Sequence, residues 1–138
     1  DDLRRCVIVD IDGTVALMNG RGPFDWSRVG EDLPNAPACQ LTHMVETATV
    51  IYLSGRDESC RVATEEWLRE HCNCCGGVRL FMRPAGDMRD DRIVKREIYE
   101  REIRGKYNVL FVLDDRDKVV RQWREMGLPC FQVAEGDF

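Results

Sequence analysis

The sequence DIDGT at residues Asp10–Thr14 follows directly on the apolar run CVIV at Cys6–Val9. Four β-compatible apolar residues that end at a turn signal predict a short buried strand. In a continued strand Asp10 and Asp12 would share one face, with the intervening isoleucine on the other. Gly13 lets the chain leave the strand just after Asp10. Both carboxylates are therefore expected at the carboxyl edge of the strand, where open α/β sheets bind ligands.

Two carboxylates held this close repel each other, so such a pair persists mainly where a cation or a proton-transfer step needs it. The alternative interpretation is a solvated Asp-Gly turn between a strand and a loop, in which the two carboxylates have no function. The rest of the sequence decides between these two interpretations.

Length and composition restrict the class of protein. The chain has 138 residues, which is the size of one globular domain, so we predict a single domain over residues 1–138. Hydrophobic residues make up 43% of the sequence and charged residues 33%, as in an ordinary globular protein. No apolar run approaches the ~20 residues that span a bilayer, and no signal pattern opens the chain, so we expect no membrane attachment. The net charge of −5 argues against a nonspecific nucleic-acid binder. Because the chain begins without a methionine, it is interpreted as a piece of a longer protein.

Seven cysteines, an odd number scattered over predicted strands and helices, do not resemble a secreted disulfide framework. We therefore expect a reducing, cytoplasmic environment. The dense cluster His71–Cys75 lacks the second ligand pair of a structural zinc site, so a helix-ending loop is favoured over a metal site there. An accidental disulfide within the cluster stays open as an alternative.

Five apolar runs alternate with helical patterns or long loops. The predicted strands are Cys6–Val9, Thr49–Leu53, Val78–Met82, Val109–Leu113 and Cys130–Ala134, and the predicted helices are Pro37–Thr47, Glu58–His71, Arg89–Arg104 and Lys118–Met126. This alternation predicts an α/β, Rossmann-like fold with a parallel five-stranded sheet, right-handed crossovers and helices on both faces. The stretch Ala16–Pro34, with its glycines and prolines, is the one long irregular segment, and loops of that length usually carry function or disorder.

Polar residues follow two other predicted strands at the same edge. Ser54–Arg56 follow the second strand, Asp114–Arg116 follow the fourth, and Lys95 lies on the helix between them. Because the carboxyl ends of parallel strands converge, one edge would hold Asp10, Asp12, Ser54, Asp114, Asp115 and, close by, Lys95. Carboxylate oxygens of this kind favour Mg²⁺. A hydroxyl and an ammonium suit the oxygens of a phosphoryl group.

This set resembles the haloacid dehalogenase superfamily of phosphohydrolases. Asp10–Thr14 resembles its first motif, Ser54 its second, Lys95 its third and Asp114–Asp115 its fourth. The resemblance implies that Asp10 is the nucleophile that forms an aspartyl-phosphate, and that Asp12 acts as general acid and then as general base. It also implies Mg²⁺ as cofactor, held by the Asp10 side chain, the Asp12 main-chain carbonyl and the Asp115 carboxylate, with Asp114 close by. A carboxylate and a phosphate dianion repel, so the cation and Lys95 must neutralise charge before attack.

A narrower resemblance covers nearly the whole chain, and it is to the 3′-phosphatase half of bacteriophage polynucleotide kinases. It rests on the segments Asn19–Asp25, Ser54–Arg56, Gly86–Arg89, Asp114–Arg116 and Gln132–Phe138. The resemblance implies that DNA or RNA 3′-phosphate ends are the substrates, in a phage-infected or bacterial cytosol. It also implies a set of functionally required or substrate-binding residues, namely Arg21, Arg56, Asp87, Thr14, Gly55 and Arg89.

Two features depart from that pattern. Asp90 stands where relatives often have lysine, so a residue near Asp90, instead of Lys95, stays open as the third-motif position. No Gly-x-x-x-x-Gly-Lys-[Ser/Thr] loop is present, so the kinase half is absent from this sequence and is expected elsewhere in a full-length protein.

The spacing of the motifs predicts an open site without a large cap domain. Only Val15–Leu53 separate the first motif from the second, and this interval must also supply a helix and a strand. An open rim admits the end of a polymer, whereas small-metabolite enzymes more often enclose their ligands. Arg21 and Arg56 would then contact backbone phosphates, with surface ion pairing as the alternative.

Two other functions stay open. The first is a phosphatase of nucleotides or other small phosphate esters. The second is a non-catalytic phospho-receiver module, which also combines acids and a lysine on a parallel sheet. Receivers usually have adjacent acids after the first strand, whereas Asp10 and Asp12 are separated, so the enzyme is favoured.

Overall fold

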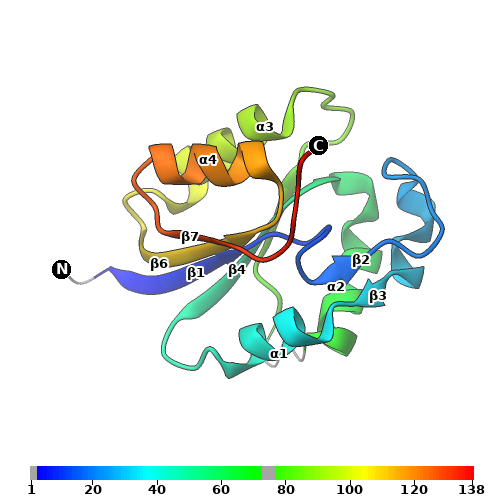
Figure 1. Cartoon of the computed structure of the whole chain (residues 1–138), viewed down its shortest axis with the longest axis horizontal. Coiled ribbons are helices and arrows are strands. Elements are labelled where there is room, and N and C mark those ends of the chain that lie inside the picture. The colour runs from blue at the N-terminus through cyan, green and yellow to red at the C-terminus, as the bar shows by residue number, and fades with distance from the viewer. Residues whose placement is uncertain (1–2, 73–76) are drawn as a thin grey trace.

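The computed structural model describes residues 3–72 and 77–138. Its centre is a sheet of five parallel strands in the order β5-β4-β1-β6-β7, with helices on both faces (Figure 1). The strands are β1 (Arg4–Val9), β4 (Thr49–Asp57), β5 (Leu80–Arg83), β6 (Tyr107–Asp114) and β7 (Cys130–Gln132). The predicted α/β fold class is confirmed.

Strand β1 lies in the middle of the sheet, between β4 and β6. Val7 and Val9 pack into the apolar core on one face of the sheet, and Cys6 and Ile8 pack into the core on the other face. None of these four side chains is more than 1% exposed. A strand covered on both faces needs a continuous apolar run, and this run is the pattern that predicted β1.

Helices α3 (Asp91–Ile98) and α4 (Asp117–Glu125) cover the face drawn at the top of Figure 1. Trp123 of α4 is 1% exposed and packs in the same apolar cluster as β1. The predicted helix Arg89–Arg104 is shorter as an α-helix, because the chain continues as a π-helical turn, Tyr99–Ile103. That wider turn carries a fully buried isoleucine into the same core.

Helices α1 (Ala36–Met44) and α2 (Arg61–His71) cover the opposite face, and a short 3₁₀-helix, Glu58–Cys60, precedes α2. Trp67 and Leu68 of α2 are buried in the core on this face of the sheet.

The segment 16–34 is only partly irregular: residues 18–25 form no helix or strand, but its two ends are paired and a short helix lies between them. Strands β2 (Ala16–Leu17) and β3 (Leu33–Pro34) pair antiparallel, and a 3₁₀-helix, Trp26–Glu31, lies between them. Strands of two residues are too short to show an alternating pattern, so the sequence could not reveal them. We call residues 16–34 the flap. It leaves the sheet at the carboxyl end of β1 (Figure 1).

Strand β4 is longer than predicted, since it continues to Asp57 and includes Ser54, Gly55 and Arg56. Its pairing with β5 shifts register between Ser54 and Asp57. Such an irregularity turns side chains at the end of a strand, a common feature beside active sites.

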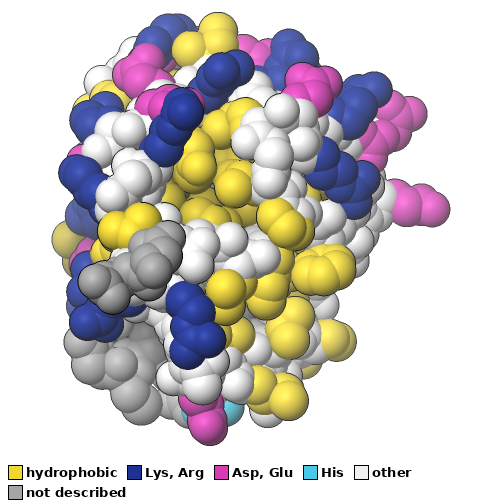
Figure 2. All heavy atoms as spheres, turned by 90° about the vertical axis from the view of Figure 1, so that its left-hand side faces the viewer, with side chains coloured by type: hydrophobic (Ala, Val, Ile, Leu, Met, Phe, Trp, Pro, Cys, Tyr) yellow, Lys and Arg dark blue, Asp and Glu magenta, His cyan; other side chains and the backbone are white. Residues whose placement is uncertain are grey.

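The end of the molecule where the strands begin has a different surface. Figure 2 shows hydrophobic side chains gathered in the middle of this face, with lysines and arginines around them. Within the described ranges, no helix is long and apolar enough to cross a membrane.

Candidate active site

Four charged side chains meet at the carboxyl end of the central strands. Asp10 follows β1, Asp114 ends β6, Asp115 follows it, and Lys95 reaches in from α3. Lys95 Nζ lies 2.7 Å from Asp10 Oδ1 and 3.0 Å from Asp114 Oδ2. One carboxylate oxygen from each aspartate lies within 4.8 Å of the other two. The sequence placed these four residues at one edge of the sheet, and the structure brings them together.

We call these four residues, Asp10, Lys95, Asp114 and Asp115, the acidic cluster. The turn at Asp10–Thr14 shapes it. The Thr14 hydroxyl lies 3.1 Å from Asp10 Oδ2 and 3.3 Å from Asp115 Oδ1, so its one proton serves either carboxylate. A Cβ on Gly13 would lie 2.1 Å from Asp115 Oδ2, and the φ of +83° at Gly13 is one that other residues rarely adopt. Glycine is therefore required at this position for the two halves of the cluster to meet.

The acidic cluster carries negative charge almost out of contact with water. Asp10, Asp115 and Lys95 are 6%, 4% and 3% exposed. Burial, and then the charge of Asp114, raise the pKa of Asp10 well above its usual value, and burial raises the pKa of Asp115. Burial alone would lower the pKa of Lys95, but the carboxylates of Asp10 and Asp114 outweigh it, and the net pKa is raised. When all are ionised, three carboxylates and one ammonium leave two negative charges uncompensated.

This charge and geometry fit a divalent cation. Mg²⁺ takes oxygen ligands at about 2.1 Å, so the ligands of one ion lie within about 4.2 Å of each other. The three carboxylates of the acidic cluster come close to that spacing, and within the described residues they are the group that could hold a metal. The Asp12 carboxylate does not belong to it. The resemblance assigned the main-chain carbonyl of Asp12 to the ion, not the side chain.

The Asp12 side chain is held by two arginines. Arg56 Nη2 lies 2.8 Å and Arg21 Nη2 lies 3.1 Å from Asp12 Oδ1. Both arginines also bind Asp32, with Arg56 Nη2 2.7 Å from its Oδ2 and Arg21 Nε 2.8 Å from its Oδ1. The side chains of Arg21, Arg56 and Asp32 are at most 1% exposed, whereas that of Asp12 is 30% exposed. Asp12 is thus the member of this arginine network that faces solvent.

The arginine network corrects the expectation for Arg21 and Arg56. Neither contact with backbone phosphates nor surface ion pairing describes them, because both guanidinium groups are buried and bound to carboxylates inside the protein. Arg56 Nη1 also donates to Thr64 Oγ1 at 3.0 Å. Their contacts point to positioning Asp12.

Sequence reasoning missed Asp32. If Arg21 and Arg56 were both buried beside Asp12 alone, one positive charge would lack a partner. This imbalance is the signal that could have indicated a second buried acid. The acid itself could not be chosen, because the fold of the flap was not predicted. Trp123, which packs in the core, also takes part in the site, because its indole N–H donates to Asp114 Oδ2 at 3.2 Å.

We expect Asp32→Asn to lower the free energy of unfolding by about 3 kcal/mol, because it leaves two buried guanidinium groups sharing one carboxylate. Turnover should fall too, since the same arginines hold Asp12. Denaturant unfolding and initial rates measure the two effects. Glu31→Gln is the matched control, because Glu31 pairs with Arg28 on the surface and should leave both nearly unchanged. An equally small effect of Asp32→Asn would show that the arginines do not depend on it.

Ser54 lies near the carboxyl end of β4, the strand next to β1, and is 1% exposed. Its hydroxyl accepts a hydrogen bond from the main-chain N–H of Arg56 at 3.0 Å, which leaves its own proton for another acceptor. Gly55 was expected to bind substrate, but its structural contact is different. A Cβ there would lie 2.4 Å from Asp91 Oδ1, so the glycine makes room for that carboxylate.

The loop 84–90 carries Asp87 and Arg89, and neither belongs to the acidic cluster. Arg89 Nη2 lies 2.7 Å from Asp87 Oδ2, and Arg89 Nη1 lies 2.7 Å from Glu97 Oε2. Arg83, the last residue of β5, donates from Nη1 to the Asp87 carbonyl at 3.1 Å and so holds the loop at the rim. Their contacts with each other and with Glu97 leave the predicted substrate-binding role of Asp87 and Arg89 as a prediction.

Asp90 is the N-cap of α3, and its side chain accepts a hydrogen bond from the Arg92 main-chain N–H at 2.9 Å. A short acid is favoured at an N-cap because it satisfies a free main-chain donor. Lys95, one turn into the same helix, is the residue whose amine reaches Asp10. The geometry therefore favours Lys95 over Asp90 for the third-motif position.

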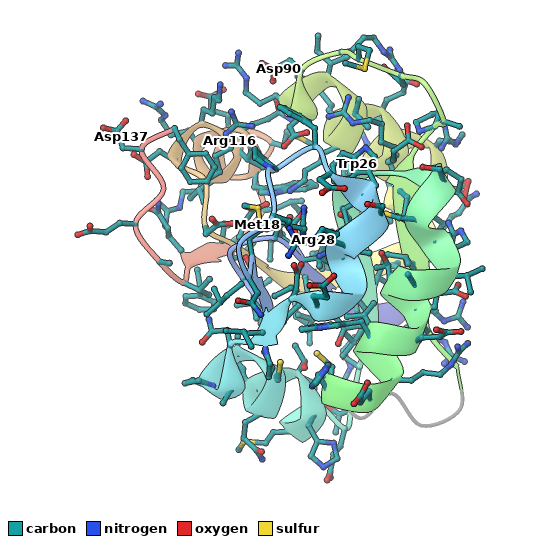
Figure 3. The ribbon with its side chains drawn as sticks, turned by 90° about the vertical axis from the view of Figure 1, so that its right-hand side faces the viewer. Met18, Trp26, Arg28, Asp90, Arg116 and Asp137 are labelled. Carbon is teal, nitrogen blue, oxygen red and sulfur yellow. The ribbon has the colours of Figure 1, made fainter. Side chains whose placement is uncertain are left out.

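The acidic cluster is largely closed off from solvent. The chain has no separate lid domain among its described elements, and the flap extends from the carboxyl end of β1 (Figure 1). The acidic cluster is at most 6% exposed, and Asp12 marks the accessible side. Figure 3 looks at this rim and shows Met18, Trp26 and Arg28 of the flap on the same side of the molecule as Arg116.

The predicted cysteine cluster is only partly described. His71 ends α2, and Cys72 Sγ lies 3.4 Å from Cys39 Sγ of α1 without a disulfide. The other residues of the cluster, 73–75, lie outside the described residues.

Comparison with known proteins agrees with this geometry. The family model for the polynucleotide kinase PNKP phosphatase domain matches residues 4–138. The chain belongs to this family. The PNKP phosphatase domain is the family that the motifs predicted, and membership makes a phosphatase the established class of this domain.

Individual relatives agree. A protein of Autographa californica nuclear polyhedrosis virus, named as a bifunctional polynucleotide kinase/RNA ligase, is 35% identical over 133 residues, which is 94% of this chain and 19% of that protein. A chain in the structure of the Pnkp1/Rnl/Hen1 RNA repair complex superposes with a TM-score of 0.93 at 45% identity, over 99% of this chain and 44% of that chain. The class C acid phosphatase from Bacillus anthracis shares the fold, with a TM-score of 0.51 at 12% identity over 92% of this chain and 63% of that chain. This chain therefore spans less than half of its PNKP relatives.

Proposed function

We propose that this domain is a Mg²⁺-dependent polynucleotide 3′-phosphatase that removes terminal 3′-phosphates from DNA or RNA through an aspartyl-phosphate. The observation that carries the proposal is the buried acidic cluster, in which Asp10 contacts Lys95 and lies beside two further carboxylates. This arrangement holds one carboxylate in place to attack, sets the Lys95 ammonium beside it, and leaves negative charge that a bound cation would neutralise.

The proposed reaction has two displacements. Asp10 attacks phosphorus in line, the bond to the 3′ oxygen of the terminal sugar breaks, and Asp12 gives that oxygen its proton. Asp12 then takes a proton from water, whose oxygen attacks the aspartyl-phosphate and releases Asp10 and inorganic phosphate. One acid/base thus serves both steps. Asp12 suits this role because it is the partly exposed carboxylate of the arginine network.

The remaining residues hold the phosphoryl group and neutralise its charge. Lys95 offers a buried ammonium and Ser54 offers its hydroxyl proton. Asp10, Asp114 and Asp115 would hold Mg²⁺ together with the Asp12 carbonyl. When bound, Mg²⁺ would supply the charge that the acidic cluster lacks and would polarise the phosphoryl oxygens.

The site supports a polymer end over a small ester. The reacting groups are nearly buried, yet the elements that the structure describes include no separate lid domain. A terminal phosphate would enter while the rest of the strand stays outside, near the Asp87–Arg89 pair of the loop 84–90. We assign Arg21 and Arg56 to holding Asp12, and Thr14 to orienting Asp10.

Substrate length tests the proposal. Phosphate release should be faster from a 3′-phosphorylated oligonucleotide than from the matching nucleoside 3′-monophosphate at the same concentration. Equal or faster release from the monomer would replace the polymer substrate with nucleotides or other small esters. A single equivalent of phosphate per protein, instead of many turnovers, would replace the enzyme with a phospho-receiver module.

We expect Mg²⁺ to raise the melting temperature more at pH 7.5 than at pH 5. The pKa values of Asp10 and Asp115 are raised in the metal-free fold, so below these pKa values the carboxyls hold protons that stabilise the fold and compete with the ion. As the pH rises through them, the metal-free fold loses that stability and the ion restores it. Surface acids also change stability with pH, because their pKa values are lowered, that of Asp87 to about 2. Their contribution is the same with and without Mg²⁺, so it cancels when the two melting temperatures are subtracted.

Asp115→Asn is the control for this measurement, because it removes one ligand and keeps the shape of the side chain. We expect the Mg²⁺-dependent shift to shrink at pH 7.5. A shift that is the same at both pH values, or unchanged in Asp115→Asn, would place the ion elsewhere.

Relatives of this domain are longer than the sequence itself. We propose that it works as the phosphatase module of a larger end-healing protein that also carries a kinase domain, in a reducing cytosol. The family relatives named for a kinase/RNA ligase and for an RNA repair complex support that proposal.

A further inference from the structure

The tail that follows β7 is tied to the metal-binding end of β6. The Val133 N–H donates to the Asp114 carbonyl at 3.0 Å, and the Asp117 N–H donates to the Gly136 carbonyl at 2.9 Å. The tail therefore runs along the residues that follow Asp115. In Figure 1 it ends on the same side of the molecule as the carboxyl ends of the strands, and Figure 3 shows Asp137 near Arg116 on this rim.

Phe138 is held here although its ring is not buried. Arg116 Nε donates to the main-chain oxygen of Phe138 at 2.8 Å, and the Arg116 guanidinium carbon lies 5.1 Å from the centre of the ring. Arg116 Nη1 in turn lies 3.2 Å from Asp91 Oδ2. Phe138 remains 65% exposed. An aromatic ring that is fixed through both its main chain and one face, yet open to solvent, is preorganised for a ligand and adds little to a core.

The location fits the part of a substrate that leaves the site. Gly13, next to Asp12, lies against the Asp115 carboxylate, so the side of the site that holds Asp12 adjoins the residues that lead to Arg116. In the proposed reaction Asp12 protonates the 3′ oxygen of the terminal nucleoside. The sugar and base attached to that oxygen would then lie over this part of the rim.

We propose that the Arg116–Phe138 pair is a stacking platform for the base of the terminal nucleoside. The proposal rests on the polynucleotide 3′-phosphatase function and adds the residue that recognises the nucleoside. Stacking on an aromatic ring accepts every base, since each has a π-face, and a guanidinium behind the ring adds favourable charge beside the strand. The platform would raise affinity for an end that carries a base, without selecting its sequence.

The test compares Phe138→Leu with wild-type protein on two 3′-phosphorylated oligonucleotides, one with a normal terminal base and one with a tetrahydrofuran abasic unit in its place. Leucine keeps an apolar side chain but removes the π-face. For the normal end we expect Phe138→Leu to raise KM about tenfold with little change in kcat. For the abasic end we expect wild type and variant to have the same, already raised, KM, because the interaction is absent from both. Phe138→Trp should restore the wild-type KM on the normal end.

Phe24→Leu is the matched control. Phe24 is 78% exposed on the flap, where its ring meets Trp26 edge-on, with centroids 6.2 Å apart. If Phe24→Leu alone shows the base-dependent loss, the platform lies on the flap and the proposal is overturned. If Phe138→Leu raises KM equally for both oligonucleotides, or raises it for glycerol phosphate, Phe138 merely supports Arg116 and is not a stacking platform. If KM is unchanged on every substrate, Phe138 has no role in binding. Failure of the proposed function has another signature, since wild type would then hydrolyse glycerol phosphate and neither oligonucleotide.

Discussion

Asp10→Asn should reduce phosphate release from a 3′-phosphorylated oligonucleotide by at least about a thousandfold, because an amide is a poor nucleophile toward phosphorus. The fold should survive. The amide oxygen of the asparagine can still accept a hydrogen bond from Lys95 Nζ, which lies 2.7 Å from Asp10 Oδ1. Burial and the neighbouring carboxylates raise the pKa of Asp10, so its charge is unfavourable in the metal-free fold. Without Mg²⁺, the variant should therefore melt at the same temperature as wild type or higher.

The measurement combines three readouts. Initial rates give the loss of turnover, melting curves without Mg²⁺ give the stability, and acid quenching during turnover traps a hydroxylamine-sensitive phosphoenzyme in wild type and none in the variant. Glu31→Gln, which changes an exposed carboxylate on the flap, should leave all three as in wild type. Residual turnover above about a hundredth of wild type, with the fold intact, would remove Asp10 from the nucleophile role.

The sequence was sufficient for the sheet and for the acidic cluster, and the reason is physical. A strand buried on both faces needs an unbroken apolar run, and β1 and β4 show one. In a parallel sheet the ends of such runs converge, so the polar residues that follow them had to meet. Asp10 and Asp114 are more than a hundred positions apart, and their approach to Lys95 follows from topology alone.

The flap could not be predicted on the same basis. Its strands have two residues each, and its helix is a 3₁₀ turn, so no hydrophobic period develops. The arginine network is built on the flap, since Arg21 and Asp32 both belong to it. As a result, the sequence named both arginines and predicted contacts with backbone phosphates, but it could not reveal their buried contacts with Asp12 and Asp32. Their contacts depend on a fold that only the structure shows.

The arginine network fits the role proposed for Asp12. Arg21 and Arg56 fix its Oδ1, yet 30% of the side chain is exposed to solvent. Both arginines are shared with Asp32, which keeps them from neutralising Asp12 alone. A carboxylate that is oriented but still accessible is what a proton donor to a leaving oxygen requires.

Asp12→Asn should therefore slow the first displacement by about a thousandfold when the leaving group is a sugar hydroxyl, which needs a proton to depart. With p-nitrophenyl phosphate the same step should change by less than about tenfold, because that leaving group departs as the anion. The arginines should stay in place, since the asparagine oxygen can accept their hydrogen bonds. The variant would separate the two roles of Asp12, because breakdown of the aspartyl-phosphate still lacks its base.

Stopped-flow measurement of p-nitrophenol makes that separation visible. Asp12→Asn should give a rapid burst of about one equivalent per active site, followed by slow turnover, as the aspartyl-phosphate accumulates on Asp10. Glu31→Gln, which changes a surface carboxylate of the same flap, should show wild-type turnover on both substrates. A burst rate that falls as far with p-nitrophenyl phosphate as with the oligonucleotide would exclude Asp12 as the general acid. A variant with no burst and normal steady turnover would exclude it as the base, because release of phosphate would then proceed without the carboxylate that deprotonates water.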